Sequence, residues 1–226
     1  MATPAIQSPH LLQLLENLKE VERLMAIHTK VAGDGRGRKY DVEVLNKSAI
    51  VLVVACWEAF VEDLAELALK ALVDGAKDHT VIPTSILERV ASKNTGMNAW
   101  KLAGAGWKSA IRDNYKEVLA KTTGSLNTPR APQVDELFAK TIGLPDPSSH
   151  WSWPRRKASQ TTTTLDRLVS LRGSIAHRVS HSQSVTKREV TSALDLVARL
   201  AIKSNNTVRK FVHARTNVYP WHEISE

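Results

Sequence analysis

The sequence of 226 residues contains one cysteine, Cys56, and no apolar run long enough to cross a bilayer. A single cysteine excludes an intramolecular disulfide and fits a reducing compartment. Its neighbours are apolar, which favours a packing role over that of a nucleophile. The longest apolar run, residues 49–57, stops at Glu58 and is too short for a membrane span. No secretory signal is visible either, so we expect a cytoplasmic protein without a membrane partner.

The sequence also lacks the patterns of common metal and nucleotide sites. None of its eight histidines belongs to a His-Glu-x-x-His pattern, and the carboxylates do not cluster as a two-metal nuclease requires. Residues 33–38 are rich in glycine, but no Gly-Lys-Ser/Thr follows them. We therefore predict neither a metal ion nor a cofactor, and we interpret 33–38 as a basic turn.

Positive charge is concentrated in the C-terminal third of the chain, which has a formal net charge of +8. Residues 1–145 hold 18 Lys and Arg against 17 Asp and Glu, whereas residues 146–226 hold 13 against 6. This asymmetry indicates a polyanionic partner for the C-terminal third. A solvated basic face without a partner is the alternative.

Apolar residues recur at helical spacing along most of the chain, and no segment alternates as a strand would. Ser8 and Pro9 predict the start of a first helix, and Asp41 predicts the cap of a long second one. Thr186 and Glu189 have the spacing of a capping box that opens a last helix. We therefore predict an all-α protein, an up-and-down helical bundle.

The predicted organisation is a single helical domain, 1–226, with a helical insertion or lid at 75–142 and an irregular loop at 143–160. Glycine, proline and asparagine divide the insertion, and Gly104 and Gly106 weaken its middle helix. A further helix is predicted from about Thr164 onward. The predicted helices of the insertion are about 84–92, 97–122 and 132–142.

The irregular loop carries aromatic and basic residues side by side. Trp151 and Trp153 can stack on bases, and the run that follows can neutralise phosphates. The alternative is that both tryptophans fasten the loop to the core. The basic residues of this candidate RNA interface are Arg155, Arg156 and Lys157.

Arg172 and His177 provide the chemistry for cutting RNA without a metal ion. An imidazole can transfer protons near neutral pH, and a guanidinium can hold a phosphate and stabilise developing charge. Five positions along a straight helix rotate about 140°, so the two side chains do not share one narrow face. They can converge if His177 lies where the helix ends, or if two copies face each other across a dimer axis. We favour the second arrangement, because it supplies two histidines.

Two segments resemble one family. Residues 171–177, Leu-Arg-Gly-Ser-Ile-Ala-His, resemble the Arg-x4–6-His signature of HEPN domains. Residues 53–64 contain a Trp-Glu pair and are similar to the matching helix of the RiboL-PSP-HEPN branch. HEPN domains are all-α bundles that dimerise and often act as metal-independent endoribonucleases. The resemblance implies catalytic roles for Arg172 and His177 and a supporting acidic role for Glu58.

One departure from the family pattern follows the motif arginine. Many active members place a polar residue there, where this chain has Gly173. Ser174, one position later, is a candidate substitute, and Arg178 is a candidate RNA contact next to the motif. An inactive RNA-binding or protein-interaction module of the same fold is therefore the alternative to an enzyme.

The resemblance implies a homodimeric endoribonuclease with a composite active site. Such an enzyme cleaves RNA by attack of the 2′-hydroxyl and leaves a 2′,3′-cyclic phosphate. The resemblance further implies that the protein is a toxin or an anti-phage defence effector. An antitoxin or regulatory protein would then be a second partner beside RNA.

Overall fold

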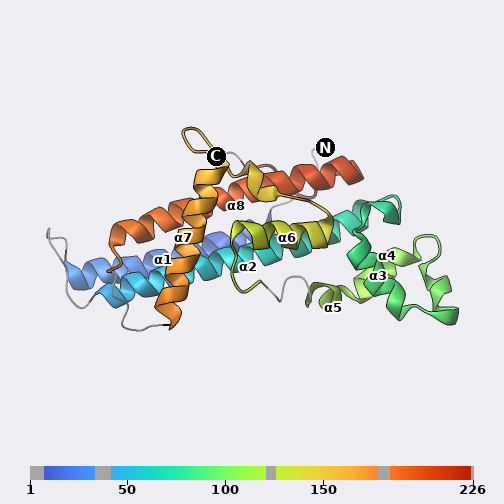
Figure 1. The fold of residues 1–226 in the computed structure, drawn as a ribbon, viewed down its shortest axis with the longest axis horizontal. Helices are drawn as coiled ribbons and strands as arrows, with labels where there is room; N and C mark the ends of the chain where they lie inside the picture. Colours follow the sequence, from blue (N-terminus) through green and yellow to red (C-terminus); the bar gives the residue numbers. More distant parts are fainter. Residues whose placement is uncertain (1–7, 34–41, 121–125, 178–183, 225–226) are drawn as a thin grey trace, which may run out of the picture.

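The computed structural model describes residues 8–33, 42–120, 126–177 and 184–224. Within these ranges the chain is helical and forms no strand, apart from one isolated bridge between Trp153 and Arg156. The all-α prediction is confirmed. In chain order, the helices are α1 (Pro9–Ala32), α2 (Glu43–Gly75), α3 (Thr84–Lys93), α4 (Gly106–Asp113), α5 (Tyr115–Ala120), α6 (Ala131–Ile142), α7 (Ala158–His177) and α8 (Lys187–Thr216), with the 3-10 turns η1 (His79–Val81), η2 (Gly96–Leu102) and η3 (Pro147–His150) (Figure 1).

Helix α2 is the centre of the fold. Helices α1 and α8 lie along it, α6 packs beside it, and α7 crosses it at a steep angle (Figure 1). By length and composition α2 could cross a membrane, since its mean hydropathy reaches 1.7 over one stretch. Half of that stretch is buried against the surrounding helices, an arrangement typical of the central helix in an α-helical domain.

Tryptophans tie the loops between these helices to the core. Trp57 of α2 is fully buried, and its Nε1 donates a hydrogen bond of 2.9 Å to the carbonyl oxygen of Pro129, just before α6. Trp151 meets the Trp57 ring edge-on at 5.7 Å and donates from Nε1 to Ser204 Oγ of α8 at 2.9 Å. The indole N–H groups of Trp57 and Trp151 thus both have a partner, as is usual for buried polar groups.

The predicted helix starts are confirmed at two of three places. Pro9 is the first residue of α1, after Ser8. The capping box of α8 is present, because the Thr186 backbone N–H donates to Glu189 Oε2 at 2.7 Å and Thr186 Oγ1 accepts from the Glu189 N–H. Asp41 lies outside the described residues.

Helix α7 begins at Ala158, earlier than the predicted start at Thr164. The intervening residues form a run of threonines with low helix propensity, which hid the helix from the sequence pattern. Their hydroxyls donate to carbonyl oxygens three or four residues earlier, such as Thr163 to Ser159 at 2.9 Å. These bonds satisfy the hydroxyls within the helix, although bonding of this kind slightly destabilises a helix rather than promoting it.

The segment predicted as an insertion is divided between two places. Helix α6 packs on α2 and α7 as part of the bundle, whereas α3, η2, α4 and α5 gather around the far end of α2 (Figure 1). The predicted helix over 97–122 is broken into η2, α4 and α5, within the described residues. One reason is Gly104, whose φ of +57° belongs to a left-handed turn rather than a helix.

Candidate active site and RNA interface

Arg172 lies on the inward face of α7. That face is made by Leu165, Leu168 and Val169, all buried against the core, and Arg172 follows Leu168 by one helical turn. The Arg172 side chain is half-buried, and its Nε has no hydrogen-bond partner in the described part of the chain. A buried guanidinium N–H without a partner is unusual, because most buried polar groups are hydrogen-bonded.

Glu58 of α2 lies within electrostatic reach of Arg172. Burial raises the pKa of the Glu58 carboxyl, and attraction by the Arg172 guanidinium lowers it in part. One turn later, burial raises the pKa of Glu62, and the negative charges of Glu58 and Asp63 raise it further. The structure therefore brings together two of the residues predicted for the site, Arg172 and Glu58, at the contact of α7 with α2.

His177 lies on a different face of the same helix. It is exposed and is the last described residue of α7. Five steps of helix rotate it about 140° from Arg172, into the arc occupied by Asp166 and Ser170. Within one copy of the chain, the arginine and the histidine of the motif therefore do not share a face.

An open groove of about 890 Å³ runs along the outward face of α7 toward the start of α8. Arg167, Ser170 and Ser174 line it from α7, and Glu189 lines it from α8. Helical spacing places Ser174 about one turn before His177 on this side. Ser174 donates from Oγ to the Leu171 carbonyl oxygen at 2.8 Å. It therefore lies with the histidine and not beside the arginine.

The residue patterns of the sequence did not single out Arg167, Ser170 and Arg130. Arg130, at the start of α6, donates to Ser170 Oγ at 2.9 Å and to the Asp166 carbonyl oxygen at 3.2 Å. A signal for the groove was present, because polar residues recur every three or four positions along α7 up to the motif histidine. That pattern predicts one continuous polar face.

The prediction that Trp151 stacks on bases is wrong. Its side chain is fully buried and its only polar atom is bonded to Ser204. Trp153 is half-buried between two guanidinium groups, with Arg156 at 5.4 Å and Arg199 at 5.7 Å from the ring centre. For Trp151, the alternative of fastening the loop to the core is therefore correct.

The basic residues of the loop have different surroundings. Arg156 is half-buried and donates to the hydroxyls of Thr161 and Thr164, so it supports the start of α7. Arg155 and Lys157 are exposed, and Arg155 stands at the tip of a tight turn with a φ of +68°. Of the predicted basic contacts in this loop, these two side chains are the ones free to meet a phosphate.

The loop and the Arg–His motif lie at opposite ends of α7 (Figure 1). The helix has 20 residues, which corresponds to about 30 Å at about 1.5 Å per residue. One short stretch of RNA therefore cannot contact both within a single copy of the chain. Arg178 lies outside the described residues, so the structure does not place it relative to the motif.

Among the described residues, no group of three or more His, Cys, Asp or Glu side chains is placed to hold a metal ion. Glu58 of α2 interacts electrostatically with the Arg172 guanidinium, and Glu62 follows it one turn later along α2. The contact between α2 and α7 thus combines the Glu58 carboxyl with the Arg172 guanidinium, while the His177 imidazole is exposed on another face of α7.

The fold and the motif define an all-α domain with an Arg–His pair in the second half of its α7. A family model described as RiboL-PSP-HEPN matches residues 12–210, which is most of the chain. The chain therefore belongs to the RiboL-PSP-HEPN family. No curated protein and no solved structure shows a significant match. HEPN domains are commonly ribonucleases or RNA-binding domains, so the family suggests RNA as the ligand class.

Proposed function

We propose that this protein is a cytoplasmic, metal-independent endoribonuclease whose active site is completed when two copies pair. The observation that carries the proposal is the division of the motif between two faces of α7. Arg172 interacts with Glu58 of α2, whereas His177 is exposed at the last described residue of α7. A second copy can supply the histidine that the first cannot bring to its own arginine.

The proposed reaction uses the RNA's own nucleophile. His177 of one copy removes the proton of the 2′-hydroxyl, and the 2′-oxygen attacks the adjacent phosphorus. The bond from phosphorus to the 5′-oxygen breaks, His177 of the other copy protonates that oxygen, and a 2′,3′-cyclic phosphate remains. Each proton transfer of this kind contributes typically about 10²–10⁴-fold.

Arg172 is assigned to the phosphate. Its rigid fork of N–H donors suits the oxygens of the five-coordinate phosphorus, where negative charge develops. Loss of one such stabilising group costs on the order of 10²–10³-fold in rate. Glu58 is a positioning residue in this scheme, because its carboxylate attracts the guanidinium from the neighbouring helix.

The polar groove is the proposed path of the RNA strand. Arg167 lies in it on the exposed surface, and the Ser170 and Ser174 hydroxyls continue toward His177. Hydroxyls and a guanidinium are the usual partners of the phosphate and sugar groups of a nucleic acid. Exchange of Arg167 for Gln should weaken RNA binding and lower its salt dependence.

The test is cleavage of single-stranded and structured RNA by the purified protein in EDTA. The wild type should release products with a 2′,3′-cyclic phosphate, and Arg172→Ala and His177→Ala should each lose at least about 10²-fold in rate. Arg215→Ala is a matched control, since it removes an arginine from the end of α8. Cleavage that survives both motif substitutions, or that needs a divalent ion, rejects the proposal.

A non-catalytic RNA-binding module is the second candidate, and Gly173 after the motif arginine favours it. It predicts RNA binding that weakens steeply with salt and no cleavage by the wild type. A role as a toxin or defence effector with an antitoxin partner extends the first candidate. It predicts growth arrest on expression of the wild type, but not of His177→Ala, and rescue by a co-expressed neighbouring product.

A further inference from the structure

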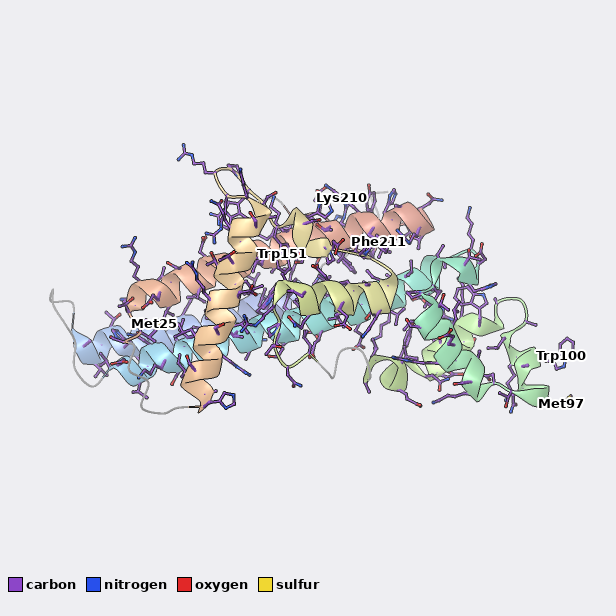
Figure 2. The ribbon with its side chains drawn as sticks, in the orientation of Figure 1. Met25, Met97, Trp100, Trp151, Lys210 and Phe211 are labelled. Carbon is purple, nitrogen blue, oxygen red and sulfur yellow. The ribbon has the colours of Figure 1, made fainter. Side chains whose placement is uncertain are left out.

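The two most exposed large apolar side chains of the described chain lie on η2, far from the motif. Met97 is 84% exposed and Trp100 is 76% exposed. Figure 2 shows both at the tip of the α3–α5 region, with the Trp100 ring pointing away from the ribbon. A tryptophan in a folded protein normally covers about 150–250 Å² of apolar surface. An indole held in water at a tip therefore indicates a contact surface.

The turn that carries Trp100 has a defined shape. Gly104 has a φ of +57°, which a residue with a side chain rarely adopts. A Cβ on Gly106 would lie 1.9 Å from the carbonyl oxygen of Lys101, so only glycine permits this close approach. The Ala103 N–H donates to the Trp100 carbonyl oxygen at 3.2 Å. The two glycines therefore permit a tight turn of the backbone directly after Trp100.

The same segment borders an apolar pocket of about 460 Å³. Its lining includes Leu102 of η2, Trp107 of α4, Leu87 and Val90 of α3, and His79. The volume lies within the range of about 300–1,000 Å³ that is usual for small-molecule sites. This pocket therefore offers an apolar surface to a flat aromatic ligand group that binds next to η2.

The charge of this region favours a polyanion. Residues 76–120 hold 7 Lys and Arg against 4 Asp and Glu. Lys101, directly after Trp100, is exposed, and its ammonium group makes no hydrogen bond or ion pair within the described part of the chain. An exposed aromatic ring beside a free ammonium group is the combination that binds single-stranded nucleic acid, because the ring stacks on a base and the cation meets the phosphate.

We propose that Trp100 is a stacking platform for an unpaired base of single-stranded RNA, with Lys101 on a neighbouring phosphate. This inference rests on the proposed action on RNA and adds a second contact region, in the α3–α5 region away from α7 (Figure 1). Duplex RNA is a poor ligand for it, because its bases are already stacked. A protein partner would instead use Met97 and Trp100 alike as apolar anchors.

The experiment uses the full chain with His177→Ala, so that the RNA stays intact during the measurement. Fluorescence anisotropy follows binding of a labelled single-stranded oligoadenylate of about twelve nucleotides, with a duplex of equal length in parallel. Trp100→Ala should raise the Kd for the single strand by roughly 5- to 100-fold, and Trp100→Phe should keep most of the affinity. Lys101→Gln should reduce the slope of log affinity against log salt by about 0.7.

Met97→Ala is the matched control, because it removes an equally exposed apolar side chain from the same turn. It should change the Kd by less than about two-fold, within the usual effect of a surface substitution. An unchanged Kd for Trp100→Ala, equal binding of duplex and single strand, or an equal loss with Met97→Ala overturns the platform.

Cleavage by the wild type separates this result from the proposed function. RNA cleaved normally with no effect of Trp100→Ala on binding rejects the platform alone. Binding that depends on Trp100 without any cleavage supports the platform and rejects the nuclease. Absence of RNA binding in every form of the protein rejects both.

Discussion

Glu58 on α2 and Arg172 on α7 act on each other across the contact between the two helices, where the arginine lowers a carboxyl pKa that burial has raised. The motif arginine is half-buried, whereas His177 is exposed on another face of α7. Within one copy, the proposed catalytic arginine and histidine therefore lie apart.

Pairing wild-type chains with His177→Ala chains tests whether two copies share a site. The proposed reaction uses His177 of both copies, so a mixed dimer lacks one of the two proton-transfer groups. At a 1:1 ratio with random pairing, cleavage should therefore fall to about a quarter of that of an all-wild-type sample with the same total protein. The His177→Ala protein alone should stay inactive. Cleavage at half of the wild-type level, in samples with verified mixed dimers, would contradict sharing of this kind.

Removal of the Glu62 charge should stabilise the protein at neutral pH. Burial, Glu58 and Asp63 all raise the Glu62 pKa above its ordinary value of 4.5. The ionised carboxylate therefore opposes folding above its raised pKa, and this cost disappears below the unfolded value. Glu62→Gln should raise the Tm at about pH 7–8, with the gain fading as the pH falls through the raised pKa and absent well below 4.5.

Thermal unfolding over a range of pH measures this gain. Glu88→Gln, on the exposed side of α3, is the matched control and should change the free energy of unfolding by no more than about 0.5 kcal/mol. An equal rise of the Tm in acid and at neutral pH would show that the gain of Glu62→Gln does not come from removal of the carboxylate charge.

Gly173→Ala should stabilise the protein. Gly173 lies inside α7, and a Cβ added there meets nothing within 4 Å. Replacing a helical glycine by alanine gains roughly 0.5–1 kcal/mol, and about 1 kcal/mol raises the Tm of a chain of this size by about 2–4 °C. Gly75→Ala provides the contrast, because its Cβ would lie 2.7 Å from Thr216 Cβ, and it should lower the Tm. A Tm of Gly173→Ala below that of the wild type would contradict the conclusion that an added Cβ has free space at this position.

Trp151→Phe should lower stability without affecting RNA binding. The change removes the hydrogen bond from Trp151 Nε1 to Ser204 Oγ, both in the core, at an expected cost of about 1–3 kcal/mol for the polar group left behind. Urea unfolding measures the loss, and Ser204→Ala removes the same bond from the other side, so the double variant should lose less than the sum. RNA affinity that falls with intact stability would show that the indole does meet RNA.

The sequence predicted the long helices because their signals are local. Apolar spacing marks α1 and α2, and the Thr186–Glu189 pair marks the start of α8, each within a few neighbouring residues. The helix over 97–122 could not be divided correctly, because its break depends on the left-handed turn at Gly104. The role of Trp151 was equally open, since the same indole can stack on a base or bond to a distant Ser204.

The sequence by itself determined the residue types of the motif, the all-α class and the family, all of which follow from order and spacing along the chain. Only the tertiary structure decided which way each side chain faces. Because a helix has about 3.6 residues per turn, an offset of five residues places Arg172 and His177 on different faces of α7. The packing of α7 on α2 turns the face with Arg172 toward the interior. Tertiary packing likewise buries Trp151 in the core, whereas Trp100 lies on a turn with glycines and is exposed to solvent.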